Sequence, residues 1–192
     1  MKVVGLTGGI ATGKTTACHY LHTLSVPIID ADIINHKLLE PNQKGYLGLL
    51  KLFPDIPLIE QQLDKKYLRK ILFNDAHAKQ QIEHLLHPII KQSIQQEIDS
   101  IDKSTPYCII AVPILIEANF QYLVDTIWVT DCSVNTQITR LMLRDNITIE
   151  DAKNILQHQL TREERLSYAN EVISTENTID MQKTLDFLHL QF

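Results

Sequence analysis

The chain has 192 residues, of which 44% are hydrophobic, and a formal net charge of −5; this is most simply one domain with insertions. The negative charge argues against a nucleic-acid binder, which needs an excess of Lys and Arg, and no apolar run approaches the 18 residues of a membrane span. Three cysteines, Cys18, Cys108 and Cys132, lack metal-ligand pair spacing, so we expect reduced thiols and a cytoplasmic protein. Because the charge disfavours nucleic acid, the expected partner is a small molecule.

A first strand is expected at residues 2–7, and a glycine-rich loop follows it. Residues 8–15 read Gly-Gly-Ile-Ala-Thr-Gly-Lys-Thr, which matches the phosphate-loop pattern between a strand and a helix. We expect Lys14 to reach the β- and γ-phosphates of ATP and Thr15 to bind Mg²⁺. The residues expected to bind the nucleotide are Gly8, Gly9, Ile10, Ala11, Thr12, Gly13, Lys14, Thr15 and Thr16.

Two carboxylates, Asp30 and Asp32, end and follow a second strand expected at residues 26–30. Open α/β sheets bind ligands beyond the carboxyl ends of their strands, so both side chains are candidates for the active site. Asp32 is assigned as the base and Asp30 as a supporting or metal-linked residue. The alternative is that one of them only caps the next helix. His36, one turn beyond Asp32, either contacts substrate phosphate or is structural.

The interval from residue 60 to residue 103 shows no strand pattern and has apolar residues at helical spacing. It is interpreted as the main part of a helical insertion that covers residues 36–103. Pro88 lies inside this pattern, so the helix is expected to kink or restart there.

Three further strands are expected near residues 107–112, 126–130 and 171–173. The first of these ends without an aspartate that would hold Mg²⁺, so metal binding depends on Thr15, with Asp30 or Glu117 as possible helpers. Short strands that alternate with helices predict an α/β fold of the phosphate-loop (P-loop) NTPase type. The expected architecture is a parallel five-stranded sheet flanked by helices, with a helical substrate-binding insertion and an arginine-bearing lid.

Four of the five arginines lie between residues 140 and 165. Arg140 and Arg144 are four residues apart on an expected helix, and Arg162 and Arg165 are three apart. Guanidinium groups suit the charge of a transferring phosphoryl group, so a lid at about residues 137–160 is predicted, with Arg140 and Arg144 as its functional pair. The alternative is a solvated helix surface paired with Asp145, Glu163 and Glu164.

Together these segments resemble the dephospho-coenzyme A kinase family over nearly the whole chain. The segments that carry the resemblance are Gly5 to Ile10 with Gly13 to Thr16, Asp30-Ala31-Asp32, Leu85-Leu86-His87-Pro88, Val112 to Glu117, Gln137 with Arg140, Arg144 and Asp145, and Gln159 with Thr161-Arg162-Glu163. The phosphate loop alone indicates a nucleotide binder, whereas the other segments in this order are specific to the family.

The resemblance implies transfer of the γ-phosphate of ATP to the 3′-hydroxyl of dephospho-CoA, the last step of coenzyme A synthesis. It implies a nucleotide-binding core at residues 1–35 and 104–192 and a CoA domain at residues 36–103. In this reading Asp32 is the base, Lys14 holds phosphates and Arg140 belongs to the lid, with Arg144 on the nucleotide. Substrate contacts are assigned to Asp30, His36, His87 and Glu117; a helix kink with a packed imidazole explains His87 equally well.

The chain departs from the family pattern at two places. Position 11 is Ala where the family usually has Gly, and Ala11 is expected to keep its φ angle below zero. Residues 171–177 lack the Asn-x-Gly turn that usually follows this strand, which leaves adenine contacts there open.

Two other functions remain open from the sequence. One is a kinase of the same architecture that acts on a nucleoside or nucleotide, and the other is an ATP-binding regulatory module without transferase activity. For all three we expect a monomer or a weak homo-oligomer that binds neither nucleic acid nor membrane.

Overall fold

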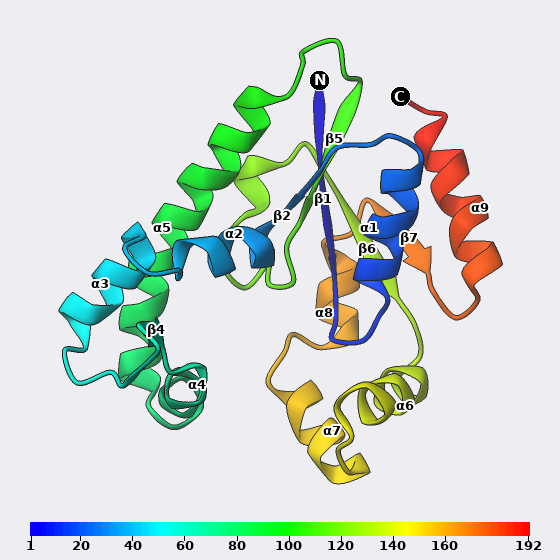
Figure 1. Ribbon diagram of the computed structural model, residues 1–192. Helices are drawn as coiled ribbons and strands as arrows, with labels where there is room; N and C mark the ends of the chain where they lie inside the picture. Colours follow the sequence, from blue (N-terminus) through cyan, green and yellow to red (C-terminus); the bar gives the residue numbers. More distant parts are fainter. The chain divides into compact units, whose positions relative to one another are not determined.

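The computed structural model describes the backbone of residues 1–192 and every side chain except that of Phe73. The chain forms two compact units. Figure 1 shows the chain coloured along its sequence. The first comprises residues 1–29 and 101–192, and the second comprises residues 30–100. The sequence placed the insertion at residues 36–103; its role in acceptor binding stays a prediction.

A five-stranded parallel sheet organises the first unit, as predicted. Its strands, in spatial order, are β2 (Ile28–Asp30), β5 (Tyr107–Ala111), β1 (Lys2–Gly8), β6 (Thr126–Asp131) and β7 (Glu171–Ser174). The central strand β1 pairs with β5 and with β6, so that Leu6 lies opposite both Ala111 and Trp128. Strand β5 is buried along its whole length, as expected for a parallel strand covered on both faces.

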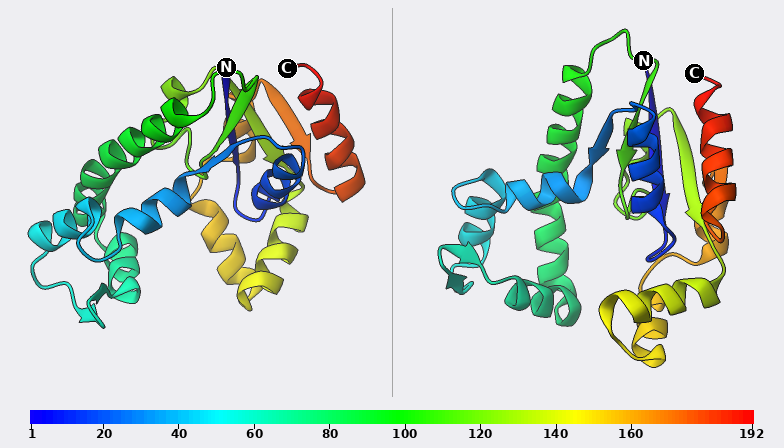
Figure 2. Two further views of the ribbon diagram at one scale, coloured as in Figure 1. Left: turned by 45° about the horizontal axis from the view of Figure 1, so that its top comes forward. Right: turned by 45° about the vertical axis from the view of Figure 1, so that its right-hand side comes forward.

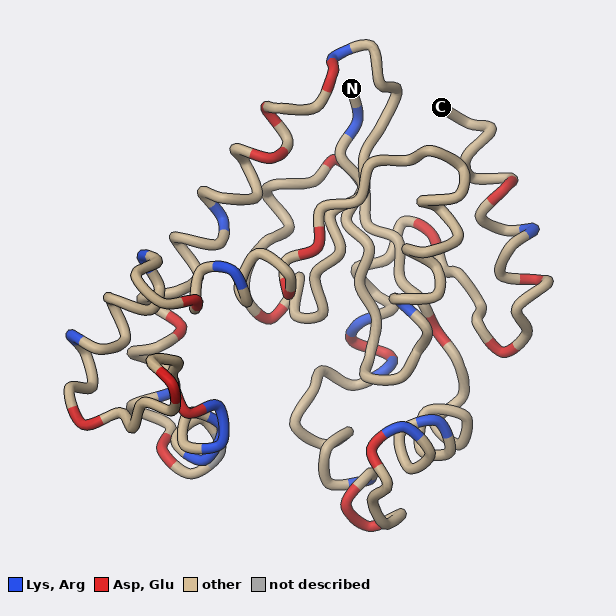
Figure 3. The backbone as a smooth tube through the Cα atoms, in the orientation of Figure 1, with Lys and Arg blue, Asp and Glu red and all other residues tan. Residues whose placement is uncertain are grey.

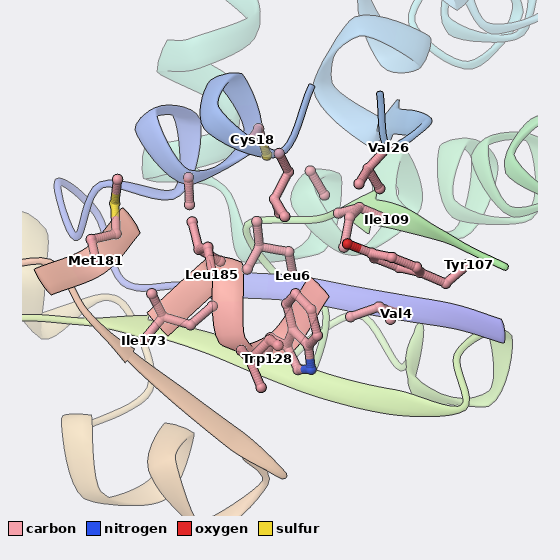
Figure 4. Close-up of a cluster of buried hydrophobic side chains, with 14 residues drawn as sticks. Val4, Leu6, Cys18, Val26, Tyr107, Ile109, Trp128, Ile173, Met181 and Leu185 are labelled. Atoms are coloured by element: carbon pink, nitrogen blue, oxygen red, sulfur yellow. The ribbon is translucent and has the colours of Figure 1, made fainter. Parts of the chain in front are cut away.

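The helices of the first unit follow the strands in the alternation that the sequence predicted. They are α1 (Lys14–Thr23), α6 (Val134–Asp145), α7 (Ile149–Gln157), α8 (Arg162–Ser167) and α9 (Thr178–His189), with a short 3₁₀ helix, η1, at Gln121–Leu123. Helices α1 and α9 lie side by side in both views of Figure 2. They bury Leu21 and Leu185 in one apolar cluster with Leu6 and Trp128 of the sheet (Figure 4).

The second unit is built around α5 (Ala76–Ser100), a helix of 25 residues. The other elements of this unit are α2 (Ala31–Leu38), α3 (Lys44–Leu52), β3 (Leu58–Ile59), β4 (Gln62–Leu63) and α4 (Lys65–Asn74). Helices α2, α3 and α4 all pack against α5, which buries Ile90, Ile94 and Ile98 at a spacing of four residues. The short strand β4 pairs with β3, so the expectation that residues 60–103 contain no strand is wrong in this detail.

Pro88 does not divide α5, because the helix is continuous from Ala76 to Ser100. Of the two outcomes that the sequence allowed, a restart at Pro88 is therefore excluded. A proline inside a helix removes one backbone hydrogen bond and costs about 3 kcal/mol. Leu86 and Ile90 are buried on either side of it, and burial of such side chains contributes roughly 2 kcal/mol each, enough to offset that cost.

Among the described residues, no helix is both long and apolar enough to cross a membrane.

Lys and Arg gather along α4 and along α6 to α8, as the blue segments of Figure 3 show. Helix α4 carries Lys65, Lys66, Arg69 and Lys70.

Candidate active site

The phosphate loop joins β1 to α1, and the amino end of α1 has no side-chain cap. Gly13 precedes this helix with a φ angle of 85° and gives it no side-chain hydrogen bond. Asp30, Ser133 and Thr148, by contrast, cap α2, α6 and α7 through their side chains. The first amides of any helix lack partners within the helix. Those of Lys14 and Thr15 are therefore left to an anion, which a helix amino end favours.

Other backbone groups of the loop are held by side chains from distant elements. Gln137 of α6 donates from Nε2 to the Ile10 carbonyl at 2.8 Å, and the Ile10 amide donates to Gln159 Oε1 at 2.8 Å. The Thr175 hydroxyl donates to the Thr12 carbonyl at 2.7 Å. Gln137 and Thr175 are both buried, where such bonds are costly to lose. These side-chain contacts fix the backbone of the loop at Ile10 and Thr12.

Ala11 has a φ angle of 59°, so the expectation that it stays below zero is wrong. A left-handed conformation costs a residue with a Cβ roughly 1–2 kcal/mol. Ala11 packs with Ile10 against an apolar cluster of Ile138, Leu141 and Ala152, on α6 and α7. The turn of the loop requires the positive angle, and this packing helps to offset its cost.

Lys14 is half-buried and Thr15 is exposed at the start of α1. No group of three or more His, Cys, Asp or Glu residues in the described part of the chain could hold a metal ion. Mg²⁺ bound to phosphates keeps several waters and needs only one or two protein ligands. A single hydroxyl at Thr15, at the helix end without a side-chain cap, therefore fits a nucleotide-bound Mg²⁺.

The acidic pair of the second strand divides between two roles. Asp30 caps α2, because its Oδ1 accepts the amides of Asp32 at 2.8 Å and Ile33 at 3.4 Å. This is the capping role that the sequence left open for one of the two. Asp32 lies exposed in the first turn of α2, one turn before the exposed His36.

A cavity of about 310 Å³ lies in the second unit, beside His36. The ammonium of Lys65, at the start of α4, contacts His36 Nε2 at 3.0 Å. Both residues line the cavity with Glu40, and Leu39, Leu63 and Leu68 add apolar walls.

His87 lies half-buried in α5. Burial lowers the pKa of its imidazole, Lys91 and His84 lower it further, and Glu83 raises it. His87 is therefore a neutral side chain at neutral pH, which suits either a packed imidazole or a hydrogen-bonding contact to a ligand.

The two arginines chosen as the functional pair lie in different surroundings. Arg140 donates to the Thr175 carbonyl at 2.6 Å and to its hydroxyl at 3.3 Å. Arg144 is exposed and forms two hydrogen bonds with Asp145, at 2.7 and 2.8 Å. Hydrogen bonding to this carboxylate raises the pKa of the guanidinium. Arg140 is thus joined through Thr175 to the phosphate loop, whereas Arg144 has the surface pairing given as the alternative.

Several residues around the loop had no assigned role in the sequence analysis. Gln137 and Gln159 were noted only as family positions, and Thr175 lies in the segment without an Asn-x-Gly turn. The hydrogen bond from Thr175 to the Thr12 carbonyl joins this segment to the phosphate loop. Asn177 of the same segment caps α9. A Gln or Thr in one sequence carries no local pattern that marks such contacts. Glu117, which the sequence did assign to substrate, is exposed after β5.

The geometry defines a P-loop kinase fold, and comparisons with solved structures agree. Dephospho-CoA kinase from Campylobacter jejuni superposes with a TM-score of 0.73 at 28% identity, covering 98% of this chain and 96% of that one. Shikimate kinase from Acinetobacter baumannii shares the fold, with a TM-score of 0.54 at 16% identity over 100% of this chain and 94% of that one.

Sequence relatives narrow the class further. A family model described as dephospho-CoA kinase matches residues 2–181. Dephospho-CoA kinase from Hydrogenovibrio crunogenus is 39% identical over 94% of this chain and 92% of the relative, and that from Photobacterium profundum is 37% identical over 99% and 95%. The chain belongs to the dephospho-CoA kinase family, and it is a kinase.

The φ angle of Ala11 generates a prediction for stability. Ala11→Gly should change the free energy of unfolding by no more than about 1 kcal/mol, because relief of strain offsets the entropy of glycine and a lost methyl contact. Ala11→Val should lower it by at least about 2 kcal/mol, since a β-branched residue strongly resists positive φ. Urea denaturation measures both, and equal tolerance of Gly and Val would contradict the conformation described for the loop.

Proposed function

We propose that this chain transfers the γ-phosphate of ATP to the 3′-hydroxyl of dephospho-CoA, giving coenzyme A and ADP. The observation that carries the proposal is the phosphate loop in a chain of this family. The loop leads into α1, whose first amides have no side-chain cap and are available to phosphate. We further propose that the reaction takes place in the cytoplasm, with a small-molecule acceptor and no nucleic acid or membrane partner. The protein is expected to act as a monomer or a weak homo-oligomer.

On the donor side, the loop amides and Lys14 bind the phosphates of ATP and hold the γ-phosphate for attack. Thr15 would hold Mg²⁺, which neutralises charge on the β- and γ-phosphates during transfer. Arg140, held half-buried against Thr175, adds a second fixed cation on the nucleotide side. Arg144 is proposed to bind nucleotide after exchanging its surface partner Asp145.

On the acceptor side, Asp32 is proposed to accept the proton of the 3′-hydroxyl. The 3′-oxygen then forms a bond to the γ-phosphorus, the bond from that phosphorus to the β,γ-bridging oxygen breaks, and ADP leaves with the electron pair. Residues 36–103 are proposed to bind the rest of dephospho-CoA. His36 with its cavity, His87, Asp30 and Glu117 are the candidate contacts.

An acceptor panel tests the reaction directly. With Mg²⁺ and ATP, release of ADP should be fastest with dephospho-CoA and at least about tenfold slower with nucleosides and nucleotides, because only dephospho-CoA fills the whole acceptor site. A coupled ADP-release assay makes the comparison, and mass spectrometry identifies coenzyme A as the product. A nucleoside or nucleotide that outperforms dephospho-CoA would replace the proposed acceptor, and no turnover with any of them would favour a regulatory ATP-binding module.

The role of Asp32 has its own test. Asp32→Asn should lower kcat by roughly 10²-fold or more while the Kd for ATP stays within about twofold, since a base acts mainly in the transition state. Steady-state kinetics and equilibrium ATP binding provide the two readouts.

Asp64→Asn is the matched control for Asp32→Asn. Asp64 caps α4 through its Oδ1, which accepts the amides of Lys66 and Tyr67, and Asn caps helices about as well as Asp. Near-normal turnover is expected for this control.

Loss of ATP binding in Asp32→Asn would make Asp32 a residue of the metal or nucleotide site and not the base.

A further inference from the structure

All four arginines after residue 139 donate to oxygen atoms of the protein, but three of them are half-buried or exposed. Arg140 donates to Thr175, Arg144 to Asp145, and Arg162 to both carboxylate oxygens of Asp131. The carboxylates of Asp145 and Asp131 also offset the charge of Arg144 and Arg162. The fourth, Arg165, is placed differently.

Arg165 of α8 is 6% exposed, and it is the one charged residue among the buried residues that the structure describes. It donates one hydrogen bond, from Nη2 to the Leu160 carbonyl at 2.7 Å, and the ion pairs found among the described residues do not include it. Guanidinium has five N–H donors. A buried cation with so few partners is costly unless a ligand supplies the rest.

The guanidinium of Arg165 lies against the backbone of the phosphate loop. A Cβ atom built on Gly9 would come within 2.8 Å of Arg165 Nη1 and within 2.8 Å of Gln137 Nε2. The glycine at this position therefore makes room for the two side chains. Burial lowers the pKa of Arg165, while Glu117 and Asp131 raise it; even so, an arginine stays charged at neutral pH.

Arg165 also lines a cavity of about 560 Å³ in the first unit. Lys153 and Arg162 line the same cavity, together with Gln137 and Gln159, which bind the loop at Ile10. Its lining includes three cationic side chains and no Asp or Glu. Cationic and amide donors around a concave site suit a phosphate group, which guanidinium binds through two parallel hydrogen bonds.

We propose that this cavity is a phosphate subsite in which Arg165 binds a phosphate group of a substrate. The inference rests on the proposed function, which offers two sources for that group: the γ-phosphate of ATP or the diphosphate of dephospho-CoA. Arg165 then holds the group beside Gly9, at the edge of the loop that binds the remaining phosphates of ATP.

Binding measurements on three ligands distinguish the two sources. Calorimetry gives the Kd of ADP, of ATP without acceptor and of dephospho-CoA for wild type, Arg165→Met and Arg165→Lys. ADP is the internal reference, because it lacks the γ-phosphate and its own phosphates belong to the loop. Lys183→Met is the control, since Lys183 is exposed on α9 and lies outside both residues 36–103 and the lining of this cavity.

Arg165→Met should weaken ATP by about tenfold to hundredfold if the subsite holds the γ-phosphate, or dephospho-CoA by a similar factor if it holds the diphosphate. ADP should change by less than about twofold in either case. Arg165→Lys should recover part of the loss, because it keeps the charge without the two-pronged geometry. Lys183→Met should leave the Kd of all three ligands unchanged.

Unchanged affinity for all three ligands in a folded Arg165→Met would overturn the proposal. Equal weakening of all three, with a lower melting temperature, would assign Arg165 a structural role in place of phosphate binding. If Arg165→Met does not fold, Arg165→Lys decides, and affinities equal to wild type for both ATP and dephospho-CoA would refute the subsite. Failure of the proposed reaction would appear separately, as wild-type protein that binds ATP but does not phosphorylate dephospho-CoA.

Discussion

The backbone of the phosphate loop is held by buried and half-buried side chains, and the rest of the site depends on this. Thr12 and Thr175 bind loop carbonyls, and Gln137 and Gln159 bind the carbonyl and the amide of Ile10. In a buried setting these bonds are strong and costly to break. They fix the loop without using the amides at the start of α1. Those amides stay available to phosphate, which preorganises the site and lowers the cost of binding.

The same contacts couple the loop to the arginine-bearing helices. Ile10 and Ala11 pack on Ile138 and Ala152 of α6 and α7. Gln137, which binds the loop, lies in α6, and Gln159 follows α7. Arg140 reaches Thr175, which itself binds the loop. A movement of α6 and α7 during the reaction must therefore repack these groups. Equally, a phosphate bound in the loop favours the arrangement that these helices have here.

Local patterns in the sequence were sufficient for the parts of the site that are local. The spacing of Gly8 to Thr15 predicts the loop between β1 and α1, and alternating strands and helices predict the sheet. The choice between a supporting or metal-linked role and a helix cap at Asp30 needed coordinates, because both roles suit an aspartate at that place. The positive φ of Ala11 was missed because only glycine is expected there.

The partners of the arginines could not be read from spacing. Arg140 and Arg144 share a helix, yet one donates to Thr175, 35 residues away, and the other to its neighbour Asp145. Arg165 is buried because the fold brings α8 against Gly9. The sequence of α8, with four charged residues out of six, does not reveal this burial. Likewise, the bond from Thr175 to Thr12 joins residues 163 apart. Such contacts depend on how the strands are ordered in space, and the family resemblance named the positions without their partners.

Hydrogen exchange of the loop amides, followed by NMR, tests the central claim most directly. Without nucleotide, the Ile10 amide should be protected by Gln159, while the amides of Lys14 and Thr15 exchange rapidly. Addition of ADP and Mg²⁺ should protect Lys14 and Thr15 and leave Ile10 nearly unchanged. Rapid exchange at Ile10 in the free protein, or protection of Lys14 and Thr15 before nucleotide is added, would contradict a loop that is held from behind and open to phosphate.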